Sequence, residues 1–285
     1  MKILVLGSEG MLGHVVKRYF ENKGYEVYAT SRNKENENYF DLTDNIKNID
    51  EIVDRIKPQV VINCIGLLNK VAEENQSLAV LINSYLPHYM DELSEKKNFK
   101  FIHVSTDCVF DGKKGQYAVD SFKDAYSFYG QSKALGEINN NRSVTLRTSI
   151  VGPDENPKGI GLFQWFMNQG NETRGYSKAI WTGITTIQFA KCMEEAIEKN
   201  LAGLYHAVNG DKIAKADLLK LFAKYFKPST KVIEDTSFIS DKSLVLKEDD
   251  YKFNIPSYEE MIKEMKQWVL ENKDLYPNLI KKMEE

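Results

Sequence analysis

Hydrophobic and polar positions follow one another along the chain in the rhythm of strands and helices. Residues 2–6 form a short, wholly apolar run, as expected for a strand that is buried on both faces of a parallel sheet. Apolar residues then recur at helical spacing up to Lys23 and Gly24, where the glycine is placed to end a helix. The first unit is therefore predicted to be a strand, a turn and a helix.

The same unit repeats through much of the chain. Further strands are predicted at residues 26–30, 39–40, 60–62, 101–104, 144–147 and 204–208. Helices are predicted at residues 46–56, 78–93 and 185–199. Asp44 is a candidate cap for the first of these, and Pro87 is expected to kink the second. Strands that alternate with helices imply right-handed crossovers, so we predict an α/β fold with a doubly wound parallel sheet.

A glycine-rich turn joins the first strand to the first helix. Gly7 permits a tight turn, Gly10 lets the backbone approach a pyrophosphate at the positive helix N-terminus, and Gly13 allows close packing of helix on strand. This placement predicts the dinucleotide-binding turn of a Rossmann sheet, with Met11 and Leu12 as further contacts. The alternative is a glycine turn that serves packing alone.

The end of the second predicted strand bears on which dinucleotide is bound. Ser31 and Arg32 stand where NAD-preferring proteins usually carry an acidic residue, and a guanidinium beside a hydroxyl suits a 2′-phosphate. We therefore predict NADPH, with NADH as the alternative if Arg32 is only a solvated surface residue. Further cofactor contacts are expected where the next two strands end, at Asp41, Leu42, Cys64, Ile65 and Gly66.

Three residues form a candidate catalytic site. Tyr129 precedes Lys133 by four positions, so both lie on one face of a helix, and Thr106 arrives from the end of a strand. We expect the Lys133 ammonium to lower the pKa of the Tyr129 phenol and to bond the nicotinamide ribose. Tyr129 then protonates a carbonyl oxygen that Thr106 orients. The alternative is a chance pair, against which Tyr126, seven residues before Lys133, serves as an internal control.

These motifs together resemble the extended short-chain dehydrogenases/reductases, and within them the dTDP-4-dehydrorhamnose reductase group. The resemblance covers about residues 1–210 and is carried by residues 7–13, 105–112, 129–133, 136–137 and 146–149. It implies that an NADPH-dependent enzyme reduces the 4-keto group of a nucleotide-linked 6-deoxyhexulose for bacterial surface polysaccharides. The catalytic roles then fall on Thr106, Tyr129 and Lys133.

The chain departs from this family where the sugar is expected to bind. Cys108 stands where the family usually has a tyrosine, Ile150 where it usually has a tryptophan, and Leu68 falls at its threonine. Asp107, Cys108 and Ile150 are therefore expected to line the substrate pocket. A catalytic role for the Cys108 thiol is disfavoured relative to a buried or pocket-lining one.

Residues 175–183 resemble a subgroup in surface-polysaccharide synthesis, some members of which reduce UDP-linked 2-acetamido-2,6-dideoxy-4-hexuloses. Arg174 and Lys178 are expected to meet a diphosphate, and Trp181 to stack on a base or sugar. The alternative places the two cations in solvent and Trp181 in a hydrophobic core.

Two other functions remain open from sequence. A nucleotide-sugar 4-epimerase uses the same Tyr and Lys but retains tightly bound NAD. A non-catalytic regulatory subunit is the alternative from another class, because a regulatory subunit of methionine adenosyltransferase resembles this reductase group. Intact Thr106, Tyr129 and Lys133 favour an active enzyme. A dehydratase is disfavoured because Cys108 replaces the glutamate that such enzymes carry.

Two domains are expected. Residues 1–151 with 184–212 are predicted to form the NAD(P)-binding Rossmann domain. Residues 152–183, which are richer in Gly, Pro and Asn, and residues 213–285, helical with short extended pieces, are predicted to form a smaller C-terminal substrate-binding lobe.

Composition narrows the partners and the location. The formal net charge is −3 and both signs of charge are mixed along the chain, which disfavours nucleic acid. Three cysteines without C-x-x-C spacing disfavour a disulfide framework and a zinc site, and fit a reducing cytoplasm. Four widely spaced histidines predict no metal, and no apolar run reaches the roughly 18 residues of a membrane span. A homodimer is the default expectation for the oligomeric state.

Overall fold

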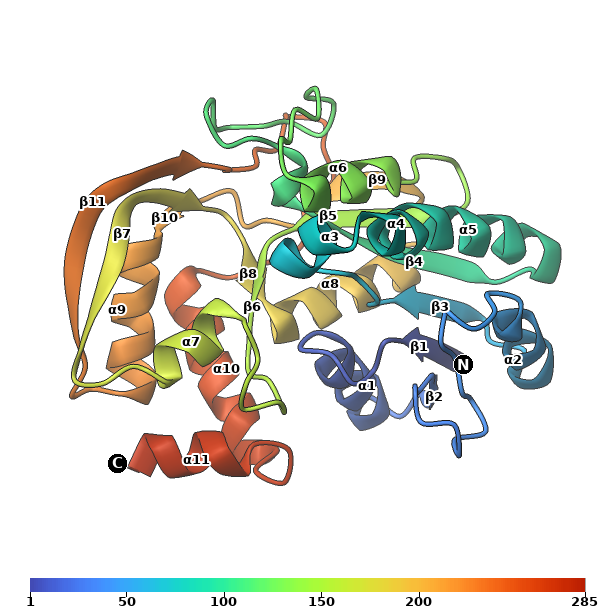
Figure 1. Ribbon diagram of the computed structural model, residues 1–285, viewed down its shortest axis with the longest axis horizontal. Helices are drawn as coiled ribbons and strands as arrows, with labels where there is room; N and C mark the ends of the chain where they lie inside the picture. Colours follow the sequence, from blue (N-terminus) through green and yellow to red (C-terminus); the bar gives the residue numbers. More distant parts are fainter. Residues whose placement is uncertain (285) are drawn as a thin grey trace.

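A parallel sheet of six strands forms the larger part of the protein (Figure 1). The structure, a computed structural model, describes residues 1–284. The strand order is β2-β1-β3-β4-β5-β9, and every neighbouring pair is parallel. The strands are β1 (Lys2–Leu6), β2 (Glu26–Ala29), β3 (Val60–Asn63), β4 (Lys100–Thr106), β5 (Val144–Thr148) and β9 (Gly203–His206). The order changes direction between β1 and β3, which is where ligands bind in such sheets.

Helices cover both faces of this sheet. Ile3 and Val5 of β1 share a hydrophobic cluster with residues of α1 (Gly13–Asn22) and α8 (Thr186–Glu198). Leu4 and Leu6 point the other way and pack with residues of α2 (Asn48–Ile56) and α5 (Leu86–Lys97). Burial on both faces explains why this strand is wholly apolar. The predicted doubly wound α/β fold is therefore confirmed.

A second, smaller sheet lies at the left of Figure 1, in the order β10-β7-β11. Its strands are β7 (Glu172–Trp181), β10 (Ile213–Ala214) and β11 (Lys231–Asp241), with β10 antiparallel and β11 parallel to β7. The helices of this part are α7 (Leu162–Met167), α9 (Lys215–Phe226), α10 (Tyr258–Glu271) and α11 (Pro277–Glu284). A short parallel pair, β6 (Ile150–Val151) and β8 (Ile184–Thr185), stands between the two sheets. Beyond residue 212 the sequence predicts only short extended pieces, whereas β11 has 11 residues.

Two local predictions are wrong. Residues 39–40 do not form a strand, because Tyr39 makes only an isolated bridge to Ser31 and the preceding residues are taken up by turns. Asp44 does not cap α2, which begins four residues later with Lys47 at the cap position. The Asp44 carboxylate instead accepts a hydrogen bond from the Tyr39 hydroxyl.

A turn of π-helix precedes Pro87, the residue at which the sequence predicts a kink, and Pro87 itself lies in the first turn of α5. Residues 76–97 run as α4 (Gln76–Ala79), the π-helical η1 (Val80–Tyr85) and α5, and the short α3 (Asn69–Glu74) precedes them. Pro87 has no N–H to donate to the carbonyl of Asn83, four residues earlier. Gly136 lies against that carbonyl, because a Cβ built on Gly136 would clash with the Asn83 oxygen. Because Gly136 has no Cβ, the end of α6 (Phe128–Leu135) packs directly on this carbonyl of the π-helix.

Candidate functional site

The glycine turn between β1 and α1 has room around its backbone at Gly10 and is closely packed at Gly7 and Gly13. Gly7 has φ +77°, and its carbonyl oxygen accepts a hydrogen bond from Gly10 N at 3.2 Å. A Cβ on Gly13 would clash with that oxygen, whereas a Cβ on Gly10 would meet nothing nearer than the same oxygen at 3.5 Å. The backbone around Gly10 is thus an open cradle beside the helix N-terminus, and it fits the pyrophosphate of a dinucleotide.

The loop after β3 packs directly on this turn. A Cβ on Gly7 would lie 2.9 Å from Ile65 Cγ1 and 3.1 Å from Ile65 N. Ile65 N in turn donates to Asn63 Oδ1 at 3.0 Å, which holds residues 64–66 in place. The structure therefore brings together the glycine turn and the Cys64 to Gly66 segment, two of the predicted cofactor-binding segments.

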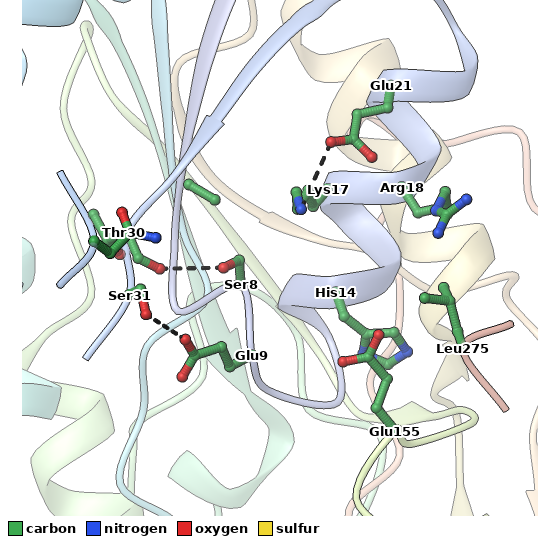
Figure 2. Close-up of a pocket in the computed structure, with 12 residues that line it drawn as sticks. Ser8, Glu9, His14, Lys17, Arg18, Glu21, Thr30, Ser31, Glu155 and Leu275 are labelled. Carbon is green, nitrogen blue, oxygen red and sulfur yellow. Dashed lines mark hydrogen bonds and ion pairs between the residues drawn. The ribbon is translucent and has the colours of Figure 1, made fainter. Parts of the chain in front are cut away.

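A cavity of about 270 Å³ lies where β2 ends, beside the start of α1 (Figure 2). Ser8, Glu9 and Ser31 line one side of it, and Ser31 Oγ donates to Glu9 Oε1 at 2.6 Å. Arg32 is exposed next to Ser31. Asp41 accepts two hydrogen bonds from Thr43, and the neighbouring Leu42 is buried in the core, so adenine contacts at these two residues stay a prediction.

Tyr129 and Lys133 lie on one buried face of α6 (Phe128–Leu135). The Ser127 side chain accepts a hydrogen bond from Gly130 N and so caps this helix. Tyr129 is 8% exposed and Lys133 is 4% exposed, whereas Tyr126 is 76% exposed and lies beside the Lys113 ammonium. Burial therefore separates Tyr129, which faces the sheet, from the control tyrosine.

Burial governs the protonation of Tyr129. It raises the pKa of the phenol above its usual value, and Cys108 and Asp107 add to the rise, while a hydrogen bond with Thr106 lowers it. The sequence predicts that Lys133 lowers this pKa, and the net shift is the opposite because desolvation is the larger effect. Tyr129 is consequently a neutral phenol at neutral pH, the form that can donate a proton.

Lys133 crosses from α6 to the neighbouring strand β4. Its Nζ donates a hydrogen bond to the Val104 carbonyl oxygen at 2.6 Å. Burial lowers the pKa of Lys133 to about 8, against the raising effects of Glu137 and Cys64. The ammonium is therefore the main form at neutral pH, and two of its three N–H groups remain to donate elsewhere.

Thr106, Asp107 and Cys108 continue directly from β4 into the 3₁₀ turn η2 (Asp107–Val109). Thr106 Oγ1 accepts from Cys108 N at 3.1 Å and donates to Asp107 Oδ1 at 3.2 Å. Burial raises the pKa of Asp107, while Lys242 and Lys215 act to lower it. Burial also raises the pKa of the Cys108 thiol to about 11, which keeps the thiol neutral. These side chains surround the Tyr129 phenol.

The residues predicted to bind substrate from β7 are not gathered at this point. Trp181 is 4% exposed and packs on Tyr258, with ring centroids 5.9 Å apart, which corrects the prediction that it stacks on a base or sugar. Arg174 and Lys178 are exposed on β7, and Arg174 lies 3.9 Å from Asp235. Ile150 is half-buried in β6. Diphosphate binding by the two cations and sugar binding by Ile150 stay predictions.

Two positioning residues escape the sequence patterns. Asn83, in the π-helix, accepts from Leu67 N and donates to Ser132 Oγ, and so ties the loop after β3 to α6. Glu137, just beyond α6, accepts from Ser105 Oγ at 2.6 Å and pairs with Arg147 at 2.6 Å. Glu137 belongs to residues 136–137, one of the segments that carry the family resemblance, and this is the sequence feature that could have identified it. Asn83 has no local signal, because its partners are far away in sequence.

The arrangement has the elements of a carbonyl-reducing site. A phenol and a hydroxyl converge at the end of β4, and the Lys133 ammonium bonds the Val104 carbonyl of the same strand. The glycine cradle stands at the end of β1, two strands away. Within residues 1–284, no group of three His, Cys, Asp or Glu side chains is arranged to hold a metal ion. None of the helices in that range has the length and hydrophobicity to span a membrane.

Relatives of known name share much of this chain. The spore coat polysaccharide biosynthesis protein SpsK of Bacillus subtilis (strain 168) is 29% identical over 217 residues, which cover 73% of each chain. The dTDP-4-dehydrorhamnose reductase of Aggregatibacter actinomycetemcomitans is 34% identical over 155 residues, 52% of this chain and 51% of that protein. The second match thus spans about half the length of its relative.

A solved structure extends the likeness to the fold. The dTDP-4-dehydrorhamnose reductase from Bacillus anthracis str. Ames, in complex with NADP, has a TM-score of 0.78 at 20% identity, and the match covers 93% of this chain and 98% of that one. At this identity the likeness shows the fold alone. The family described as RmlD substrate binding domain matches residues 1–242. Because that match spans most of the sequence, the chain belongs to the RmlD substrate binding domain family, as its motifs predict.

Proposed function

We infer that the protein is a nucleotide-sugar reductase that uses NADPH, or NADH, to reduce the 4-keto group of a nucleotide-linked 6-deoxyhexulose. The observation that carries this is the convergence of Tyr129 and Thr106 at the end of β4, the strand to which Lys133 is bonded, on the same sheet edge as the glycine cradle. Family membership and relatives named for reductase activity and for polysaccharide biosynthesis support it.

The chain's own groups divide the work on the carbonyl. When bound, the reduced nicotinamide supplies a hydride to the carbonyl carbon. Tyr129, held neutral by burial, donates its phenolic proton to the carbonyl oxygen. The Thr106 hydroxyl, whose one proton must then leave the bond to Asp107, donates to the same oxygen and orients it. Lys133, anchored on the Val104 carbonyl, keeps N–H groups free for the cofactor ribose and fixes its position.

We propose two classes of substrate. These are a dTDP-4-dehydrorhamnose-like sugar and a UDP-linked 2-acetamido-2,6-dideoxy-4-hexulose, both in the supply of surface-polysaccharide precursors. Asp107, Cys108 and Ile150 are the residues we propose to contact the sugar. Residues 152–183 with 213–285 are proposed as the substrate-binding lobe, and residues 1–151 with 184–212 as the cofactor-binding domain.

The test is a panel assay with purified protein. Reduced nicotinamide and a set of dTDP- and UDP-linked 4-keto sugars are supplied, and cofactor oxidation and the sugar product are followed together. We expect oxidation with at least one sugar of these classes. Interconversion of 4-epimers without net oxidation would instead assign the epimerase alternative. Dinucleotide binding with no turnover of any sugar would favour the regulatory alternative.

A further inference from the structure

The carboxylate of Glu9, in the glycine turn, lies beside the loop that follows β2. Ser31 belongs to this loop, and its hydroxyl donates to Glu9 Oε1 at 2.6 Å, as Figure 2 shows. The same Ser31 oxygen accepts a hydrogen bond from Asn33 N at 3.0 Å. The hydroxyl proton and one lone pair of Ser31 are thus used inside the chain, and the serine presents a negatively charged partner to its surroundings.

The position of Glu9 is set by contacts on both sides of it. Ser8 Oγ donates to the Thr30 carbonyl oxygen at 3.1 Å, and Gly7 N donates to Thr30 Oγ1 at 3.3 Å. The glycine turn is therefore joined to the end of β2 at three successive residues. Because Gly7 and Ser8 fix the backbone that carries Glu9, its carboxylate is held over Ser31 by the turn itself.

This place is where a Rossmann sheet distinguishes the two nicotinamide dinucleotides. An acidic side chain at the end of β2 accepts a hydrogen bond from the 2′-hydroxyl of the adenosine ribose, whereas a basic one favours a 2′-phosphate. In this chain the loop after β2 supplies the cation, Arg32, and the glycine turn supplies the carboxylate, Glu9. A 2′-phosphate carries up to two negative charges and would face the carboxylate directly.

We propose that Glu9 is a cofactor-specificity residue: its carboxylate accepts the ribose hydroxyl of NADH and opposes the 2′-phosphate of NADPH. Glu9 thereby offsets the preference for NADPH that Arg32 confers, so the protein binds both dinucleotides with affinities within about tenfold of each other. This role rests on the proposed function, because it requires that the glycine cradle binds a nicotinamide dinucleotide.

Equilibrium binding of NAD⁺ and NADP⁺ tests the role without a sugar substrate. Dissociation constants are measured by calorimetry for the wild type, Glu9→Gln and Glu21→Gln. Glutamine at residue 9 keeps an oxygen that accepts the Ser31 hydrogen bond and removes only the charge. Glu21 lines the same cavity on α1 and pairs with Lys17 at 3.8 Å, so Glu21→Gln is a matched control for loss of one negative charge.

We expect Glu9→Gln to tighten NADP⁺ binding relative to NAD⁺ by about tenfold, and Glu21→Gln to leave the ratio within about twofold. Added salt should narrow the difference between wild type and Glu9→Gln, because exposed charges are screened, whereas a packing role would not respond. An unchanged ratio in Glu9→Gln, with both dinucleotides bound, would overturn the role of Glu9 alone. If the wild type binds neither dinucleotide, the proposed function itself fails.

Discussion

Burial sets the chemical state of the two side chains at the centre of the site. Tyr129 is kept as a neutral phenol because desolvation raises its pKa. Lys133 is still mainly an ammonium at neutral pH, although burial lowers its pKa to about 8. The neutral Tyr129 phenol keeps its proton at neutral pH and is suited to donate it to a carbonyl oxygen.

Loss of the phenol should remove the chemical step alone. Tyr129→Phe is expected to lower kcat/KM by about 10²–10⁴-fold, because it deletes the general acid while the ring stays packed. Dinucleotide affinity should stay within a few-fold of the wild type. The exposed Tyr126→Phe is the matched control and should leave both quantities unchanged. Equal losses in the two variants would contradict the assignment of Tyr129.

The lowered pKa of Lys133 predicts that kcat/KM falls at alkaline pH. Below about pH 8 Lys133 is an ammonium with free N–H donors, and above it the charge is lost, so kcat/KM should fall as pH rises through about 8. The measurement is a pH profile of kcat/KM with a buffer series of constant ionic strength. Lys133→Met should be slower throughout and should lack this limb. Persistence of the limb in that variant would assign it to another group.

At the level of elements, two glycines of the glycine turn have different roles: Gly13 allows close packing, and Gly10 leaves room for a ligand. Gly13 faces the carbonyl oxygen of Gly7, whereas Gly10 faces open space. Gly13→Ala is therefore expected to cost about 2–3 kcal/mol in the free energy of unfolding. Gly10→Ala should cost at most about 1 kcal/mol and still weaken dinucleotide binding by about tenfold or more. Denaturant unfolding and calorimetry measure the two effects.

A large loss of stability in Gly10→Ala, or unchanged dinucleotide affinity in that variant, would contradict a binding role for the Gly10 backbone. If Gly10→Ala binds the dinucleotide as tightly as the wild type, the backbone at Gly10 does not approach the ligand.

A buried ion pair locks the end of α6 to the sheet. Arg147 and Glu137 are each 1% exposed and bond to one another, and Glu137 also accepts from Ser105 on β4. Arg147→Met should destabilise the protein by about 3–5 kcal/mol, because it strands a buried carboxylate. Lys123, a partly exposed partner of the same carboxylate, is the control, and Lys123→Met should cost about 1 kcal/mol or less. Comparable losses measured by denaturant unfolding would contradict this account.

Much of the element order was readable from hydrophobic spacing, for a physical reason. Strands such as residues 2–6 and 60–62 are buried on both faces, and their apolar runs follow directly from that. Residues 39–40 show the same local pattern but contact the sheet through one bridge, which spacing does not reveal. The π-helix carries Asn83, against which Gly136 packs, a contact between distant parts of the chain that local spacing does not show.

At the scale of the whole molecule, one hydrophobic core joins the two parts of the protein. A single hydrophobic cluster runs from Val15 and Ile102 in the Rossmann part to Phe163, Phe222 and Met265 in the smaller part. His14, at the glycine turn, is bonded to Tyr276 near the other end of the chain. Trp181 belongs to this core rather than to a binding surface, which explains why its aromatic character misled the sequence interpretation.

The candidate catalytic residues could be picked out from sequence because each lies in a short motif, and the glycine turn because its three glycines follow a strand directly. Glu9 could not, since its contact with Ser31 forms only when β1 and β2 pair. Long-range contacts of this kind are absent from local sequence patterns.

The most direct test follows the hydride itself. The protein is given a nucleotide-linked 4-keto-6-deoxyhexulose and reduced nicotinamide that carries deuterium at the transferred position, and the product is examined by NMR. The account predicts deuterium bound to C4 of the sugar, with none incorporated by Tyr129→Phe on the same time scale. Oxidation of the cofactor without deuterium at C4, or no product from any sugar of the two proposed classes, would contradict it.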